Sequence, residues 1–163
     1  MRTMETPTPP ELRGSCLCGA VRYTVRPDRL EGYYCHCRMC QRAFGNTRAA
    51  FINVRKDQVA WTAHPPARYA SSKIAVRGFC GHCGTPLSFE YLSSDRMDLA
   101  VGSLEDPGAI QPVEHYAVES RVAAWHAPDG LAERRLDEDM RLAERWREAD
   151  DGAPPGPGTH RNG

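Results

Sequence analysis

The sequence lacks an excess of charge of either sign, because its 21 lysine and arginine residues are balanced by 21 aspartate and glutamate residues. Proteins that bind nucleic acids or anionic membrane surfaces usually carry a positive field that attracts the polyanion over a long range. Zinc ions bound by the cysteines as thiolates would make the net charge more negative. We therefore expect no nucleic acid and no membrane among the partners of this protein.

The N-terminal residues also lack a continuous apolar stretch, since Pro7, Pro9, Pro10 and several charged residues interrupt the first 14 positions. A secretion signal or a membrane span requires such a stretch, so we expect a soluble protein of the cytoplasm. A complete set of disulfides within the chain is excluded as well, because seven cysteines cannot all pair. Clusters of thiols in a reducing compartment favour metal binding or catalysis.

Alternation of apolar and polar residues favours a mainly β fold of one domain, for which 163 residues are enough. Residues 21–25 alternate in the manner of a half-buried strand. Further strands, separated by turns that contain glycine and proline, are predicted at residues 49–54, 58–62, 73–79, 87–91, 97–101 and 113–118. The domain is predicted to span residues 12–149, between a disordered leader at 1–11 and a disordered tail at 150–163 that is rich in proline and glycine.

One helix is predicted near the C-terminus, from residue 131 or later to about residue 149. Leu136, Met140, Ala143 and Trp146 fall roughly on one face of this otherwise charged segment. We expect this face to pack against the sheet, and a contact between two copies of the chain is the alternative. Monomer and homodimer therefore both remain open.

The cysteines form three groups, which are Cys16 with Cys18, Cys35 with Cys37 and Cys40, and Cys80 with Cys83. Residues i and i+2 of an extended segment project to the same side, so alternate spacing suits a ligand pair carried by a strand. The last pair has the two-residue spacing of a zinc knuckle. Gly19 and Gly84 follow the first and last pairs and can adopt the positive φ that a tight turn around a metal requires.

Cys16, Cys18, Cys80 and Cys83 would together complete a tetrahedral four-cysteine zinc site, although more than sixty residues separate the two pairs. Such a site leaves no position for a substrate. Its binding free energy, on the order of 10 kcal/mol, can supply a large share of folding stability. We therefore predict a structural role for the first zinc ion.

Cys35, Cys37 and Cys40 remain, and they predict a second zinc site with three protein ligands and a fourth position open to water or substrate. An open site of this kind is predicted to be catalytic. Two alternatives remain, namely that the three thiols hold no metal or that a histidine closes the site, the candidates being His36, His82 and His115.

A thiol–disulfide redox role is a further alternative, because the chain contains two C-x-x-C pairs, Cys37 with Cys40 and Cys80 with Cys83. A thioredoxin-like pair stands at the start of a helix after a strand, within a βαβ unit. Here the surroundings are predicted to be rich in strands, and extra cysteines stand close by. The redox interpretation is therefore the less favoured one.

Short motifs between about Leu12 and Leu131 carry a resemblance to a known family. They are, in order, Gly14-Ser15-Cys16-Leu17-Cys18-Gly19-Ala20-Val21, Cys35-His36-Cys37 with Cys40 and Gly45, Tyr69-Ala70-Ser71-Ser72, Phe79-Cys80 with Cys83-Gly84-Thr85, Val101-Gly102-Ser103-Leu104, His115, Trp125 and Asp129-Gly130-Leu131. In this arrangement the chain resembles the glutathione-dependent formaldehyde-activating enzymes and their relative, centromere protein V.

The resemblance implies a β-rich fold of the kind called a β-tent. It also implies structural zinc on the cysteines at 16, 18, 80 and 83, and catalytic zinc on those at 35, 37 and 40. The implied activity is that of a carbon–sulfur lyase of the S-(hydroxymethyl)glutathione synthase type. Such an enzyme adds a small thiol such as glutathione to an aldehyde such as formaldehyde, or catalyses the reverse reaction.

Zinc suits this chemistry, because a free thiol with a pKa of about 8.5 is mostly protonated at neutral pH and the metal favours the thiolate. The residues proposed to contact a substrate carboxylate are Arg38, Arg42 and Arg77. His115 and Trp125 are expected to line the pocket. The alternative function is a non-catalytic, zinc-stabilised module that binds a protein through its β surface.

Overall fold

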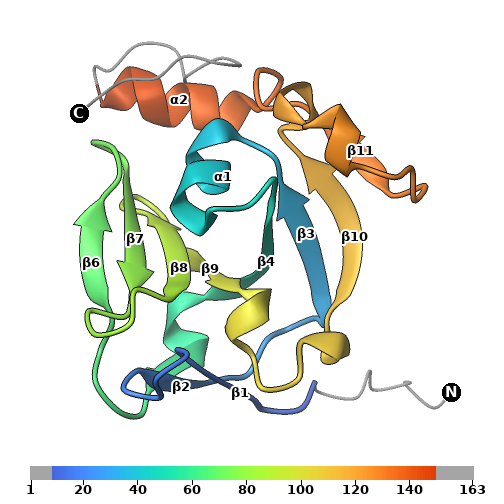
Figure 1. Ribbon diagram of the computed structural model, residues 1–163. Helices are drawn as coiled ribbons and strands as arrows, with labels where there is room; N and C mark the ends of the chain where they lie inside the picture. Colours follow the sequence, from blue (N-terminus) through green and yellow to red (C-terminus); the bar gives the residue numbers. More distant parts are fainter. Residues whose placement is uncertain (1–8, 150–163) are drawn as a thin grey trace, which may run out of the picture.

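The computed structural model describes residues 9–149 (Figure 1). Its strands are β1 (Leu12–Ser15), β2 (Arg22–Val25), β3 (Glu31–Cys35), β4 (Ala49–Arg55), β5 (Val59–Trp61), β6 (Ala67–Ala70), β7 (Ala75–Phe79), β8 (Pro86–Tyr91), β9 (Arg96–Ala100), β10 (Gln111–Tyr116) and β11 (Ala132–Arg134). Its helices are α1 (Arg38–Phe44) and α2 (Met140–Glu148), with short 3-10 turns at Lys56–Gln58, Val101–Ser103, Pro107–Ala109, Val118–Ser120 and Ala123–Trp125. None of the helices in this described part is long and apolar enough to cross a membrane.

Two sheets make up the fold. The small sheet has the order β1-β2-β5, and the large sheet has the order β11-β10-β3-β4-β9-β8-β7-β6. Neighbouring strands are antiparallel, except that β10 runs parallel to both β3 and β11. Figure 1 shows α2 lying above α1 near the ends of β3 and β10, whereas β1 and β2 lie at the other end of the molecule.

The main core lies between the small sheet and the central strands of the large sheet. Its fully buried side chains include Tyr23 and Val25 of β2, Ile52 and Val54 of β4, and Leu99 of β9. Tyr23 also has a polar anchor, because its hydroxyl lies 2.6 Å from the Ser103 hydroxyl. At roughly 25 cal/mol per Å² of apolar surface, burial of such side chains is the main force that holds the two sheets together.

The mainly β architecture with a C-terminal helix agrees with the sequence prediction. All seven predicted strands are present, within a few residues of the predicted bounds. The sequence did not predict β1, β3, β6, β11 or the short helix α1. Within the predicted leader, Glu11 forms an ion pair of 2.9 Å with Arg26. Residues 1–8 and 150–163 lie outside the described residues, so the disorder predicted for them stays a prediction.

The C-terminal helix is shorter than predicted. It begins at Met140, because the side chain of Asp139 accepts hydrogen bonds from the backbone N–H groups of Arg141 (3.1 Å) and Leu142 (3.2 Å) and so caps the helix. The prediction that Met140 belongs to the packed face was wrong, since its side chain is 81% exposed. The predictions for Trp146 and Leu136 were confirmed, since Trp146 is buried and Leu136 packs against the same cluster, to which Leu142 also belongs.

Candidate metal centre and substrate pocket

Four sulfur atoms meet where two turns approach each other, one after β1 and one between β7 and β8. These atoms belong to Cys16, Cys18, Cys80 and Cys83, and all of them lie within 4.8 Å of one another. The sulfurs of Cys16 and Cys18 are 3.6 Å apart, and those of Cys18 and Cys80 are 3.8 Å apart. A tetrahedron with metal–sulfur distances of about 2.3 Å has edges of about 3.8 Å, so this donor set fits zinc.

The first pair lies in a turn, not on a strand as predicted, because the chain leaves β1 at Ser15. Positive φ angles at Gly19 (77°) and Gly84 (78°) close the two turns, as predicted. The amide of Val21 donates to the Cys16 sulfur at 3.2 Å. A hydrogen bond with the Thr85 hydroxyl lowers the pKa of Cys83 to about 5. Both bonds favour thiolates.

Three further sulfur atoms meet at the junction of β3 and α1. Cys35 ends β3, Cys37 is the N-cap of α1, and Cys40 lies in its first turn. Their sulfurs lie within 4.8 Å of one another, and those of Cys35 and Cys37 are 3.5 Å apart. Three thiolates at this spacing are a donor set that zinc accepts. Within residues 9–149, neither sulfur group includes a histidine nitrogen or a carboxylate oxygen.

The thiols of this second group share their protons unequally. Hydrogen bonds from Cys35 and Cys40 lower the pKa of Cys37 well below its ordinary value, and the amide of Cys40 also donates to the Cys37 sulfur at 3.3 Å. The bond to Cys37 raises the pKa of Cys35, and burial raises it further. The thiolate therefore forms first at the helix start, which is the usual place for a reactive thiol.

The surroundings of the pair Cys37 and Cys40 differ from the sequence prediction, because the pair opens a helix directly after a strand. That placement is one part of a thioredoxin-like motif. The other part is missing, since β3 and β4 on either side of α1 are antiparallel neighbours and not members of a βαβ unit. Cys35 also lies beside the pair, as an additional sulfur within ligand distance.

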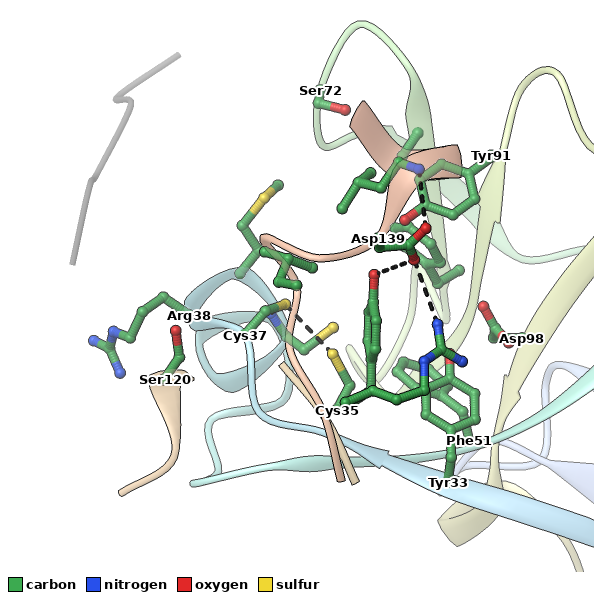
Figure 2. A pocket seen from close by; sticks show the side chains of 18 of the residues that line it. Tyr33, Cys35, Cys37, Arg38, Phe51, Ser72, Tyr91, Asp98, Ser120 and Asp139 are labelled. Carbon is green, nitrogen blue, oxygen red and sulfur yellow. Dashed lines mark hydrogen bonds and ion pairs between the residues drawn. The ribbon is translucent and has the colours of Figure 1, made fainter. Parts of the chain in front are cut away.

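A pocket of about 400 Å³ opens beside the three-sulfur group. Figure 2 shows the side chains of Cys35 and Cys37 turned toward each other at its edge, with Tyr33, Phe51 and Asp98 nearby. The three cysteines of this group line the pocket, whereas those of the four-sulfur group do not. Volumes of about 300–1,000 Å³ are typical of sites for small molecules, so this pocket beside the second sulfur group is large enough for one.

Arg77 of β7 connects the sulfurs with the pocket. Its side chain is 91% buried and lies over the ring of Phe89, and its Nη2 donates to the Cys40 sulfur at 3.5 Å. Its Nη1 is buried and has no hydrogen-bond partner, and Arg77 is one of the residues that line the pocket. A buried guanidinium with an unused N–H group is suited to bind an anionic or partly anionic oxygen.

The other residues that the sequence suggested for the pocket have different positions. Arg38 lines the pocket, but it donates a hydrogen bond to Gln41 and points away from the sulfurs in Figure 2. Arg42 does not line the pocket. The predictions for His115 and Trp125 were wrong, because neither residue lines the pocket; His115 is fully buried, and Trp125 is 75% exposed.

His36 and His115 form a buried chain next to the three sulfurs. Nε2 of His36 lies 2.8 Å from Nδ1 of His115, and Nε2 of His115 lies 3.0 Å from a carboxylate oxygen of Asp129. His36 therefore already has a ring partner in the described structure. This argues against the hypothesis that His36 or His115 closes the second site, and His82 lies in the turn of the four-sulfur group.

Several pocket residues were not predicted from the sequence. They are Tyr33, Asp98, Tyr116, Arg134, Leu136, Asp139, Leu142 and Trp146. Burial raises the pKa of Asp98 to about 6, although hydrogen bonds from Asn53 and Tyr33 oppose this. The only indication of such a role for Asp98 in the sequence was its position as an acidic residue within a predicted strand. The strand is buried on both faces, which alternation alone did not reveal.

These features define a mainly β protein with two thiol clusters able to hold metal ions, one closed and one facing a pocket. Comparison with known families identifies it further. The chain belongs to the family of glutathione-dependent formaldehyde-activating enzymes, whose family model matches residues 11–120.

Two known proteins are similar to parts of this chain. An uncharacterized lyase from Schizosaccharomyces pombe is 35% identical over 82 residues, which are 50% of this chain and 59% of that protein. The match therefore spans little more than half the length of this relative. A crystal structure of a Rhodobacter sphaeroides protein superposes with a TM-score of 0.50 at 25% identity, over 61% of this chain and 97% of that chain.

Proposed function

We propose that this protein is a carbon–sulfur lyase that adds a small thiol such as glutathione to a small aldehyde such as formaldehyde, or catalyses the reverse. One observation supports the proposal most, namely that three convergent thiols form part of the wall of a substrate-sized pocket. The family and the relative named as a lyase support the same reaction class. The proposed place of action is the cytoplasm.

The proposed reaction needs no oxidant or reductant. The thiol sulfur forms a bond to the carbonyl carbon, the π electrons of the carbonyl move to its oxygen, and that oxygen receives the proton that the thiol loses. Zinc held by Cys35, Cys37 and Cys40 would supply a Lewis acid that favours the thiolate and polarises the carbonyl. The four-cysteine zinc site is proposed to be structural.

The residues of the chain have separate proposed tasks. Arg77 stabilises the Cys40 thiolate through Nη2, and its free Nη1 donates to the oxygen that becomes negative during addition. Burial strengthens this interaction, because the guanidinium of Arg77 is largely shielded from water. Arg38, at the edge of the pocket, is proposed to contact a carboxylate of the thiol substrate.

The alternative, a non-catalytic module that binds a protein, is not favoured. A module stabilised by two structural zinc ions has no use for a pocket at one of them, nor for a buried guanidinium in its wall with one nitrogen left without a hydrogen-bond partner. Both features are expected of an enzyme, in which polar groups remain unpaired until the substrate arrives.

A matched pair of variants tests the proposal. We expect two zinc ions per wild-type chain, saturable binding of glutathione, and faster exchange between formaldehyde and S-hydroxymethylglutathione in NMR exchange spectra. Cys37→Ser should abolish this acceleration with the fold largely retained, whereas Cys83→Ser should destabilise the whole domain. One zinc ion per chain, with no thiol binding and no acceleration, would refute the enzyme hypothesis.

A further inference from the structure

The pocket has a wall that the family match does not include. The match ends at residue 120, and the segment that follows it contributes five side chains to the pocket. They are Arg134, Leu136, Asp139, Leu142 and Trp146. We call Leu136, Leu142 and Trp146 the apolar wall.

Asp139 fixes the position of this segment at its polar end. One carboxylate oxygen caps α2, and the other accepts a hydrogen bond of 2.7 Å from the Tyr116 hydroxyl at the end of β10. Arg134 lies 3.5 Å from the same carboxylate (Figure 2 marks the interactions of Asp139). The start of the helix is therefore held against the large sheet by side chains of the pocket itself.

Packing fixes the segment at its apolar end. Leu142 and Trp146 are nearly buried in a cluster with Ile74 and Ala75, at the beginning of β7. The guanidinium of Arg145 lies 4.2 Å from the centre of the Tyr91 ring. Two independent attachments make the apolar wall a fixed part of the pocket.

The pocket thus joins two chemically different regions. Phe89 contacts both the cluster that contains the sulfurs of Cys35 and Cys40 and the cluster that contains Leu142 and Trp146. The first region has the chemistry for the reacting sulfur and oxygen, whereas Leu136, Leu142 and Trp146 give the second region its apolar surface. Formaldehyde has no group that could reach the second region.

We propose that the apolar wall binds an aliphatic or aromatic substituent of the aldehyde, so that the preferred substrate is an aldehyde larger than formaldehyde. This inference rests on the proposed function. The carbon–sulfur bond forms at the sulfur group, as for formaldehyde, and the substituent on the carbonyl carbon extends toward α2. Each methylene group buried there removes apolar surface from water and strengthens binding.

Stable analogues of the thiol–aldehyde adduct test whether the apolar wall binds a substituent, without the need for turnover. S-methylglutathione and S-hexylglutathione differ only in the chain attached to the sulfur, and calorimetry measures the dissociation constants of both. We expect the wild-type protein to bind the hexyl compound at least about tenfold more tightly. Leu136→Ala and Trp146→Ala should reduce this ratio to below about threefold, because they remove apolar surface from the wall.

Met140→Ala is the matched control, because Met140 lies on the same helix, is 81% exposed and does not line the pocket. It should keep the wild-type ratio. Leu136 lies before the helix and is half-buried, so its variant is expected to fold even where Trp146→Ala loosens α2, and thermal melts check both.

Equal binding of the two analogues by the wild-type protein, or no binding of either, would overturn the inference. An unchanged ratio in folded Leu136→Ala would do the same. These outcomes are distinct from a failure of the proposed function, which is measured with formaldehyde and glutathione themselves. Formaldehyde turnover without a preference for the hexyl chain would overturn the role of the apolar wall alone. A hexyl preference without turnover of formaldehyde or of a longer aldehyde such as hexanal would refute the lyase reaction.

Discussion

Nε2 of His36 lies 2.8 Å from Nδ1 of His115, and both side chains are almost completely buried. His36 stands between two of the three pocket cysteines, whereas His115 belongs to β10. Asp129 accepts a hydrogen bond from the other ring nitrogen of His115. This carboxylate favours the tautomer with hydrogen on Nε2, so Nδ1 accepts from His36. The chain of three residues thus ties the sulfur loop to the neighbouring strand.

We predict that His115→Phe loosens this loop, because the substitution keeps a ring of similar size and leaves His36 buried without a partner. Loss of such a bond costs about 1–3 kcal/mol. Zinc analysis and urea unfolding should show weaker metal binding at the three-sulfur group and unchanged binding at the four-sulfur group. His64→Phe, at an exposed histidine, is the control. Equal weakening of metal binding at both sulfur groups would contradict a role of His115 that is confined to the three-sulfur group.

Replacement of Arg77 should lower activity more than stability. Arg77→Met removes the N–H group that donates to the Cys40 sulfur and the buried Nη1 that has no partner, and loss of one donor to a developing negative charge costs about 10²–10³ in kcat. Arg77→Lys keeps the charge but not the planar pair of donors, so we expect only partial recovery. Steady-state kinetics and thermal melts measure the two effects. A variant with normal kcat and raised KM would instead assign Arg77 to substrate binding.

The sulfur clusters could be predicted because ligand spacing is a direct constraint on the chain. Two turns with glycines, and three cysteines within six residues, leave few arrangements. The helix α1 could not be predicted in the same way. It has seven residues, too few for a periodic pattern, and depends on a cap at Cys37 and a left-handed residue at Gly45.

The pocket could be predicted only in part, because its wall joins residues that are distant in the sequence. The bond between Tyr116 and Asp139 and the packing of Trp146 on Ile74 follow from the path of the chain and not from any local pattern. Strands β6 and β11 were missed for a related reason. Their side chains are mostly exposed, so neither shows the alternation by which the other strands were predicted.

A pH dependence of stability is expected from Asp98, whose pKa is raised from 3.8 to about 6 by burial. The folded protein holds this proton more tightly than the unfolded chain does. The protonated form therefore contributes stability that is fully present below pH 3.8 and is lost as the pH rises through about 6. An asparagine side chain does not titrate, so the variant Asp98→Asn does not lose this stability. Between pH 5 and pH 8, its free energy of unfolding should therefore rise by about 1 kcal/mol relative to that of the wild type.

Urea unfolding of zinc-loaded Asp98→Asn and wild-type protein at a series of pH values measures this difference. Asp106→Asn, at an exposed aspartate, is the control and should show a constant difference. If the difference in unfolding free energy between Asp98→Asn and the wild type is also constant with pH, Asp98 is ionised throughout this range. A difference of the opposite sign would mean that its partners lower its pKa.

The last prediction concerns Asp139, which has two tasks at the edge of the pocket. Asp139→Ala removes the cap of α2 and the bond to Tyr116, and we expect a loss of about 2 kcal/mol, of which the cap supplies about 1 kcal/mol. Tyr116→Phe removes only the second interaction and should cost about half as much. Because the cap acts on α2 alone, the effect should be local.

Hydrogen exchange followed by mass spectrometry distinguishes local from global effects. In Asp139→Ala, the amides of α2 should exchange at least about tenfold faster, whereas those of the central strand β4 should keep their protection. Asp137→Ala is the control, since the exposed Asp137 pairs with Arg135 and does not cap the helix. Unchanged exchange in α2 would show that packing of Leu142 and Trp146 holds the helix without its cap. Faster exchange in β4 as well would show that α2 and the sheet unfold as one unit.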